Sequence, residues 1–503
     1  VIGGGSAGVT AAIYAAEADA SVILLSKDNV SYGNSRIIGG TMVYGEPNMS
    51  AEQQELLLRD MVVGGDYLSN QHLCKMFANE TQHTTPMFER MGGVMNRDED
   101  GNITTDSLIQ HGGHSWPRCI IFPNTGPGLG QGLRYGLNQT EGINILEKTM
   151  VYDLLRDGNK VTGAVCYELK TGKILVIYAK QVILTTGGGG WMYYPYTDNS
   201  QACTGDGYAL ALMSGAELVD MEQIQFIPYG LTHPPGLAGI AVAEPSIASP
   251  AGKLTDAKGR EILANPGSKT RAQVANAICM AVARGDGTEH GGCLLDLKGN
   301  KTDPKSNFMY KQYTKGIFKI YNNLVRKAYG AGAGNWDEPW DVYPTSHYFM
   351  GGIVIDEWGK VKGTQNLYAC GEVAGGIHGG NRLAGNAITE SLIFGKRAAK
   401  KACEQAAKQA DCKADTSLVE STVAELQSLP GRSGKYRIVE LKRELQNTMW
   451  EKAGPVRTEE QLKQALDTFD SIEGRLPAAA ISDQEKYNTE LLDAMELRLM
   501  LPV

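Results

Sequence analysis

The chain has 503 residues, a length that predicts about two to four domains. Apolar residues make up 42% of it and charged residues 21%, which is typical of a folded globular protein and excludes a disordered chain. The formal net charge of −8, without a long run of Lys and Arg, argues against a nucleic-acid-binding protein, and no apolar stretch is long enough for a direct membrane span.

The nine cysteines are scattered singly, with no C-x-x-C pair. This spacing argues against an iron–sulfur cluster, a structural zinc ion or a disulfide framework held by this chain, so we predict no metal site and a reducing, cytoplasmic compartment. The sequence opens at Val1, close before the first glycines, which is short for a strand. We therefore expect the native chain to begin earlier, which leaves export open, and membrane association through a partner is compatible with the sequence.

The first residues, VIGGGSAG, read as the end of a strand followed by G-x-G-x-x-G at Gly3, Gly5 and Gly8. An Ala-rich helix is predicted over 9–17 and a second apolar strand over 21–25. In such a βαβ opening the first glycine permits a tight turn, the second lets a pyrophosphate approach the backbone, and the third lets helix and strand pack closely. The pattern predicts a dinucleotide site, with a purely structural glycine-rich turn as the alternative.

The middle of the chain has mixed α/β character. Strands of a predicted meander cover 161–169, 174–179 and 181–185. They end in Thr185-Thr186 and a run of four glycines. Over 216–343 the pattern loosens and prolines gather, which indicates a separate lid-like domain inserted there.

The last part of the chain changes composition. Residues 351–385 return to strand and glycine-rich loop, and a helix is predicted from about 387. After about 405 glycine almost vanishes. Charged amphipathic helices are predicted over 415–428, 436–452, 458–471 and 482–499.

The glycine-rich segments, in order, read GGGSAG, TTGGGG, TGDG, HYFMGG and GEVAGGIHGGNRLAGN. With Ser26-Lys27 after the second strand and LQNTMW in the helical tail, they make the chain resemble the succinate dehydrogenase and fumarate reductase flavoprotein family, which includes L-aspartate oxidase. The resemblance covers nearly the whole chain. It implies an α/β fold in which a Rossmann-like FAD-binding domain, residues 1–215 and 344–404, carries an inserted α+β capping domain over 216–343. A C-terminal helical domain follows over 405–503.

The resemblance implies an FAD cofactor, and the residues make chemical sense of it. The three glycines offer backbone N–H groups to the pyrophosphate, and Asp206 and Glu372 accept hydrogen bonds from the cofactor. Ala387 and Ile388 open a helix whose positive end stabilises negative charge on reduced flavin. A turn-capping role for Asp206 and a structural role for Glu372 are the alternatives. The predicted cofactor-binding residues are Gly3, Gly5, Ser6, Ala7, Gly8, Ser26, Lys27, Asn34, Ser35, Gly39, Gly40, Thr186, Gly187, Asp206, Glu372, Arg382, Ala387 and Ile388.

In the respiratory members of the family a histidine near the second strand holds FAD covalently. The matching position here is Gly33, followed by Asn34-Ser35-Arg36, and no histidine is available there. The resemblance therefore implies non-covalent FAD, as in L-aspartate oxidase.

Catalysis in this family is hydride transfer between flavin N5 and one alkene carbon, while an arginine protonates the neighbouring carbon. Arg271, in KTRAQVA, resembles that arginine, and Glu244, in AEP, resembles the glutamate that reloads it. His347, in SHYFMGG, and Arg382, in NRLAGN, match the residues that grip a substrate carboxylate, and the arginine fork can do so bidentately. A structural arginine, a solvated loop acid and a core histidine are the alternatives for Arg271, Glu244 and His347.

Three departures from the family pattern concern the second carboxylate of the substrate. The family's Phe-His-Pro-Thr motif reads Phe-Ile-Pro-Tyr, with Ile227 in place of histidine, Ala243 replaces a threonine, and Ile247 replaces an arginine. An unpaired buried carboxylate would cost several kcal/mol. We therefore hypothesise a substrate with a single carboxylate, an enoate, acrylate or aryl-acrylate, and expect fumarate to bind poorly. A loop that resembles a family segment bordering the substrate offers other polar groups: His111, His114, Ser115 and Arg118.

Two other functions stay open at this point. One is an amino-acid oxidase resembling L-aspartate oxidase, which the lost motif disfavours because aspartate also has two carboxylates. The other is a flavin subunit that only relays electrons inside an iron–sulfur reductase complex. Retention of Arg271, His347 and Arg382 favours chemistry on a small carboxylate. Family members with this helical tail pair with an iron–sulfur subunit, so such an electron-transfer partner is a further expectation, whereas aspartate oxidases work without one.

Overall fold

The structure of the chain, a computed structural model, describes residues 1–46, 48–105, 108–316, 318–410 and 412–503. The helices are α1 (Ser6–Ala16), α2 (Asn34–Ile37), α3 (Ala51–Gly64), α4 (Gln71–Glu80), α5 (Thr84–Arg90), α6 (Thr125–Gln139), α7 (Asp206–Met213), α8 (Arg271–Ala283), α9 (Asn307–Thr314), α10 (Lys319–Gly334), α11 (Asn386–Ala406), α12 (Thr416–Gln427), α13 (Ile438–Ala453), α14 (Glu459–Arg475) and α15 (Thr489–Met500). Within the described ranges, no helix combines the length and the apolar character that crossing a bilayer requires.

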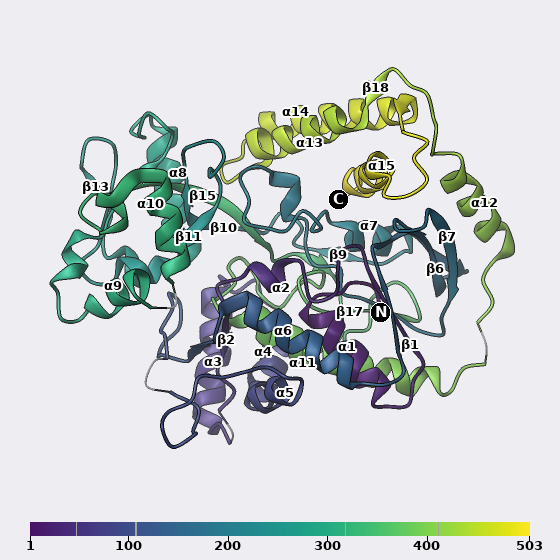
Figure 1. The fold of residues 1–503 in the computed structure, drawn as a ribbon, viewed down its shortest axis with the longest axis horizontal. Helices are drawn as coiled ribbons and strands as arrows, with labels where there is room; N and C mark the ends of the chain where they lie inside the picture. The colour runs from purple at the N-terminus through teal and green to yellow at the C-terminus, as the bar shows by residue number, and fades with distance from the viewer. Residues whose placement is uncertain (47, 106–107, 317, 411) are drawn as a thin grey trace.

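The strands are β1 (Val22–Ser26), β2 (Thr41–Val43), β3 (Cys119–Ile121), β4 (Ile143–Glu147), β5 (Thr149–Asp157), β6 (Lys160–Glu168), β7 (Lys173–Tyr178), β8 (Val182–Leu184), β9 (Leu218–Val219), β10 (Ile224–Leu231), β11 (Ala241–Ala243), β12 (Lys253–Thr255), β13 (Glu261–Leu263), β14 (Cys293–Asp296), β15 (Trp340–Phe349), β16 (Gly352–Ile353), β17 (Leu367–Ala369), β18 (Tyr436–Arg437) and β19 (Ala479–Ala480). Figure 1 shows a central α/β part, a second part at the left that contains α8, α9 and α10, and α13 and α14 lying across the top.

The central parallel sheet is built around the first residues of the chain. Ile2 bridges β1 at Leu25 on one side and β8 at Leu184 on the other, both in parallel. Strand β4 pairs in parallel with β1, and β17 pairs in parallel with β8. Helices α1 and α11 pack against each other beside this sheet. The predicted βαβ opening is confirmed, with the helix beginning at Ser6 rather than at residue 9.

A three-stranded antiparallel sheet of β5, β6 and β7 forms the predicted meander. The prediction that residues 181–185 continue it is wrong, because β8 pairs in parallel with β17 in the central sheet. Val182, Ile183 and Leu184 are all buried, as expected for a strand of a parallel sheet covered on both faces, whereas most of β7 is only half-buried.

The capping sheet has six strands in the order β11-β10-β15-β14-β12-β13. It has its own apolar core, in which Trp336 and Trp340 are fully buried. Strands β10 and β15 are its long central pair, and β15 runs on past residue 343, where the sequence pattern placed the end of the capping domain. Both strands therefore reach from the capping sheet into the central part (Figure 1).

The C-terminal segment forms the helices predicted for it. Helix α13 packs on α14 and α15, α15 packs on α7, and α12 packs on β5. Helix α15 begins at Thr489 instead of near residue 482, because residues 479–480 form β19 and the Asn488 side chain caps the helix by accepting from the Leu491 N–H. The C-terminal helices thereby cover the side of the central domain where α7 starts.

Candidate active site

One cavity of about 610 Å³ lies between the central domain and the capping sheet. Its walls include every catalytic and cofactor-binding residue predicted from the sequence except Gly8. The glycine-rich segments, although far apart in the chain, are therefore brought together around one cavity. Of the three positions where the family pattern loses polarity, Ile227 and Ala243 line the cavity, whereas Ile247 lies in the core of the capping sheet.

The glycine-rich turn before α1 forms one end of the cavity. Gly3 has φ +117°, and a Cβ there would lie 2.2 Å from the Thr185 carbonyl oxygen. A Cβ on Gly8 would lie 1.9 Å from the Gly3 carbonyl oxygen, so Gly8 acts behind the turn by letting helix and strand pack closely. Gly5 faces the cavity, where the nearest atom to an added Cβ is the Ser35 Oγ at 3.4 Å. The first helical N–H groups are thus accessible to an anion, as the pyrophosphate of a dinucleotide requires.

Three helices start at this cavity on a glycine. They are α1 after Gly5, α7 after Gly205 and α11 after Gly385, and no described side chain caps any of them. Uncapped N-termini leave N–H groups and the positive end of the helix dipole available for a negatively charged ligand. The cradle therefore fits a dinucleotide with a pyrophosphate at one end and a ring that becomes negatively charged on reduction at the other.

Glu372 lies half-buried in the cavity wall. Its Oε1 accepts the Phe349 N–H at 3.1 Å, and its Oε2 accepts from the Asn34 Nδ2 at 3.4 Å. Burial raises the pKa of Glu372 to about 7, so near neutral pH this carboxyl group can either donate or accept a hydrogen bond. This position fits the predicted contact to a hydroxyl of the cofactor.

Lys27, just after the end of β1, belongs to a buried group of charges. Its ammonium lies 2.7 Å from Asp206, 2.5 Å from the Thr204 hydroxyl and 2.8 Å from Glu496 on α15. Glu496 is in turn 2.5 Å from Lys442 on α13. An ammonium has three N–H donors, so these contacts use all of them. Burial alone would lower the pKa of Lys27, but Asp206 and Glu496 outweigh it and raise the pKa.

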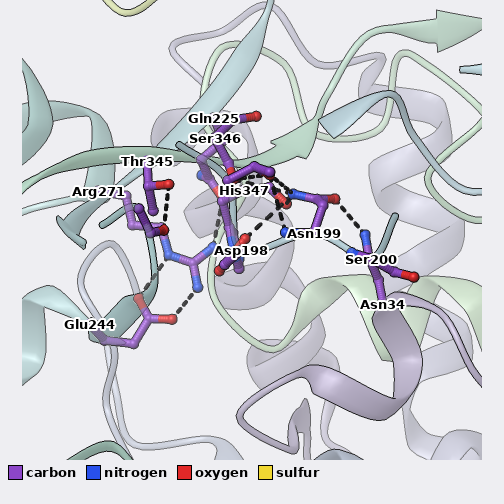
Figure 2. Close-up of polar contacts among 12 residues, drawn as sticks. Asn34, Asp198, Asn199, Ser200, Gln225, Glu244, Arg271, Thr345, Ser346 and His347 are labelled. Atoms are coloured by element: carbon purple, nitrogen blue, oxygen red, sulfur yellow. Dashed lines mark hydrogen bonds and ion pairs between the residues drawn. The ribbon is translucent and has the colours of Figure 1, made fainter. Parts of the chain in front are cut away.

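At the capping side of the cavity, Arg271 is held by two side chains (Figure 2). Its Nε donates to Glu244 Oε2 at 2.8 Å, its Nη2 donates to Glu244 Oε1, and its Nη1 donates to Gln225 Oε1 at 2.6 Å. Burial would raise the pKa of Glu244, but Arg271 outweighs it and lowers the pKa to about 2. The capping box of Thr270 and Gln273 fixes the start of α8 and with it the backbone of Arg271.

Gln225, on β10, connects Arg271 of the capping domain to the central domain. Its Nε2 donates to the Arg382 carbonyl oxygen at 2.8 Å and to Asn381 Oδ1 at 3.2 Å, while its Oε1 accepts from Arg271. The two cavity arginines are thereby joined through one amide side chain. Sequence reasoning missed Gln225, since a glutamine in a strand gives no signal of its partners.

His347 lies on β15, the strand paired with the one that carries Gln225, and contacts Asp198. Its Nδ1 is 2.7 Å from Asp198 Oδ2, and because a carboxylate only accepts, this nitrogen carries the hydrogen (Figure 2). Burial lowers the pKa of His347, with Asp198 acting in the opposite sense. The neutral ring thus holds its proton on Nδ1 and has a lone pair on Nε2. Asp198 was also missed from the sequence.

Arg382 is buried on the wall next to His347. Its guanidinium stacks 4.3 Å from the centre of the Tyr348 ring, and its Nε finds no partner among the residues that the structure describes. Burial, with a contribution from Arg271, lowers its pKa to about 10, so it remains a cation at neutral pH. A buried cation with an unused donor matches a carboxylate ligand.

The loop at residues 111–118 divides into two parts. His111 lines the cavity, whereas Ser115 and Arg118 bind the buried Asp60, and His114 Nε2 lies 2.9 Å from the Ala384 carbonyl oxygen. The last three residues therefore fix the loop, and His111 is the member of the predicted polar set that faces the cavity.

The fold and this site define a class: oxidoreductases that bind a dinucleotide on a Rossmann-like sheet and hold the substrate beneath a capping domain. The family described as FAD binding domain matches residues 1–388, and the family described as fumarate reductase flavoprotein C-terminus matches residues 442–503. The chain belongs to the fumarate reductase and succinate dehydrogenase flavoprotein family and is an FAD-dependent oxidoreductase. The family, fold class and cofactor predicted from the sequence are thus confirmed.

Individual relatives agree with this placement. A fumarate reductase (CoM/CoB) polypeptide from Methanothermobacter marburgensis is 30% identical, over 100% of this chain and 89% of its own length. The fumarate reductase flavoprotein subunit of Escherichia coli is 30% identical, over 99% of this chain and 83% of its own. A solved structure of E. coli quinol fumarate reductase has a TM-score of 0.87 at 27% identity, covering 99% of this chain and 86% of that one.

Proposed function

We propose that the protein reduces the C=C bond of an α,β-unsaturated acid that has one carboxylate, with Arg271 as the proton donor. One observation carries the proposal: Arg271, gripped by Glu244 and Gln225, lies in the wall of the same cavity as the glycine cradle for FAD. When bound and reduced, FAD would supply the hydride for one alkene carbon and would itself be oxidised. The protein must then deliver a proton to the neighbouring carbon.

Arg271 suits this task because of how its donors are used. The Nε–H and one N–H of each terminal nitrogen are engaged, which leaves one N–H on each terminal nitrogen for the substrate. A free arginine is a weak acid, but a fixed one placed against developing negative charge can transfer a proton. Glu244 is ionised at neutral pH and keeps the guanidinium oriented; after Arg271 has given up its proton, Glu244 can take up a proton transiently and return it to Arg271.

Arg382 and His347 provide the site for the single carboxylate. Arg382 offers its unpaired donor, and a proton taken up on His347 Nε2 converts that ring into a second donor, with Asp198 stabilising the resulting cation. Drawing charge toward this carboxylate makes the alkene more electrophilic. The resemblance in sequence, the stacking of Arg382 on Tyr348 and its burial all support this role.

The restriction to one carboxylate rests on two apolar residues of the cavity wall. Ile227 and Ala243 line the cavity, and neither can pair with an anion. Relatives of this chain are named for fumarate, which has two carboxylates. We therefore propose that this protein prefers enoates to fumarate.

The mode of FAD binding and the electron donor are part of the proposal. An added Cβ on Gly33 would meet no described atom within 4 Å, and no histidine occupies the segment around it, which supports non-covalent FAD. The relatives above are named as subunits of fumarate reductases. We propose that an iron–sulfur or other electron-transfer protein reduces the flavin here too.

Reduction of several alkenes by the protein with its flavin reduced tests the proposed function. Oxidation of the flavin is followed after mixing with fumarate, crotonate or cinnamate, and we expect both monocarboxylates to react with a higher kcat/KM than fumarate. Arg271→Lys, which keeps the charge but loses the fork, should retain FAD and lose turnover. A preference for fumarate would refute the monocarboxylate assignment, and full activity of Arg271→Lys would refute the proton donor.

A further inference from the structure

His111 is a cavity residue with an unused hydrogen-bonding nitrogen. The side chain is buried, and its Nδ1 lies 3.3 Å from the Ser246 hydroxyl. Its Nε2 is buried and has no partner among the described residues. Unpaired buried polar atoms are rare in native proteins because each one costs free energy, so this nitrogen points to a ligand group that satisfies it.

The loop around His111 is fixed in place. A Cβ on Gly112 would lie 2.1 Å from the Lys269 carbonyl oxygen, next to the start of α8, and a Cβ on Gly113 would lie 2.4 Å from Leu383 Cδ2. The loop is therefore wedged between the helix that carries Arg271 and the residue after Arg382. Since it cannot turn away, the imidazole remains on the cavity wall.

The charge state of His111 limits which ligand it can bind. Burial lowers the pKa of His111 to about 4. The positive charges of Arg271 and Arg382 also lower this pKa, whereas the negative charge of Glu244 raises it. At neutral pH the ring is uncharged and cannot form an ion pair with a carboxylate. It can still make a hydrogen bond to a neutral group.

We propose that His111 and Ser246 form a binding subsite for a neutral carbonyl group on the far side of the alkene from the substrate carboxylate. In this proposal the Ser246 hydroxyl, 3.3 Å from Nδ1, donates to that nitrogen; the ring hydrogen is then on Nε2 and donates to the carbonyl oxygen. Ile227 and Ala243, on the same cavity, exclude a charged group there. The substrate class is then a 2-enoate with an amide, ester or ketone at C4. This inference rests on the proposed reduction of a monocarboxylate and refines its substrate.

Three alkenes of similar shape test the subsite in the FAD-loaded protein. Crotonate has a methyl group at C4, fumaramate has a neutral amide, and fumarate has a carboxylate. We expect kcat/KM for fumaramate to exceed that for crotonate by more than about tenfold, because one well-placed hydrogen bond, worth about tenfold, adds to the electron withdrawal by the amide. Titration of the oxidised flavin spectrum with each acid gives the matching dissociation constants.

Two variants locate the effect. His111→Phe keeps a ring of similar size but cannot donate, and Ser246→Ala removes the hydroxyl that fixes the tautomer. Both should lower the fumaramate-to-crotonate ratio by about tenfold, through a loss of kcat/KM for fumaramate. Ser249→Ala is the matched control, because this hydroxyl lies in the same turn but bonds the Ser246 carbonyl oxygen.

The outcomes separate the two levels of the proposal. A fumaramate-to-crotonate ratio near one in the unmodified protein, or an equal loss of both substrates in His111→Phe and Ser246→Ala, overturns the subsite. A preference for fumarate over both crotonate and fumaramate overturns the monocarboxylate function. The subsite is decided separately, by the fumaramate-to-crotonate ratio of kcat/KM.

Discussion

Replacing Glu496 by glutamine tests how the C-terminal helices are attached to the cofactor-binding domain. The Glu496 carboxylate lies within 2.8 Å of Lys27 and 2.5 Å of Lys442, and the side chain is only 5% exposed. Glutamine keeps the shape but removes the charge that neutralises two buried ammonium groups. We expect Glu496→Gln to lose stability without a change of fold.

The size of the effect follows from this burial. Removing one partner of a buried ion pair costs about 3–5 kcal/mol, and since glutamine retains one acceptor oxygen we expect roughly 3 kcal/mol. With an unfolding entropy of about 2.1 cal/mol/K per residue, a chain of 503 residues has about 1 kcal/mol/K, so the melting temperature should fall by about 3 °C. FAD should also dissociate more readily, because Lys27 loses one of its fixed partners beside Asp206.

The pH dependence gives a second check. Burial would raise the pKa of Glu496, but Lys27 and Lys442 outweigh it and hold the pKa below its ordinary value. The stabilisation is therefore present above the ordinary pKa of about 4.3 and is lost as pH falls through the lower folded value. The difference between the unmodified protein and Glu496→Gln should be full at pH 7 and shrink in acid.

Thermal unfolding and FAD release, measured at pH 7 and again in acid near the ordinary pKa of glutamate, test these effects. Glu473→Gln, on the exposed surface of α14, is the matched control and should stay within about 0.5 kcal/mol. If Glu496→Gln is as stable as the unmodified protein at pH 7, or if its deficit persists unchanged in acid, then the buried charges do not stabilise this interface.

Three further predictions concern the cavity. Glu244→Gln should lower kcat by about 100-fold with FAD content unchanged, because Arg271 loses the carboxylate that orients and reloads it; unchanged single-turnover rates would contradict this. Crotonate binding should weaken by about tenfold per pH unit above the pKa of His347, because carboxylate binding requires a proton on Nε2; spectral titration from pH 5 to 9 should show this slope and its loss in His347→Gln. Gly8→Ala should not yield FAD-loaded protein, since the new Cβ would meet a carbonyl oxygen at 1.9 Å, whereas Gly474→Ala, a helical glycine with nothing described within 4 Å, should purify with FAD.

The parts of the molecule that sequence reasoning predicted well are those fixed by local backbone geometry. The turn requires positive φ at Gly3 and close approach of the backbone at Gly8, and only glycine permits either. The tail helices follow from hydrophobic periodicity and capping residues, which also act locally. The resemblance to a known family brought together residues far apart in the chain.

The contacts that sequence reasoning missed are non-local and have no local signature. Glu496 lies on an amphipathic helix among other acidic residues, and only the packing of α15 on α7 brings it to Lys27. Likewise Asp198 reaches His347 because residues 197 and 346 form an isolated parallel bridge. Ile247, counted with the lost polar positions, belongs to the core because the turn that holds it faces the capping sheet.

Strands β10 and β15, which reach from the capping sheet into the central part, limit how domains of this enzyme can be exchanged. Strand β10 carries Gln225 near one end and Leu231 at the other, and β15 runs from Trp340 to Phe349 past His347. A chimera that exchanged residues 216–343 alone would join half of β15 from one protein to half from another, in the middle of a hydrogen-bonded pair. Junctions before residue 224 and after residue 349 would transfer both strands whole. Such a transplant carries His347, part of the proposed carboxylate site, along with the cap, so the capping domain and that proposed site are exchangeable only as one unit.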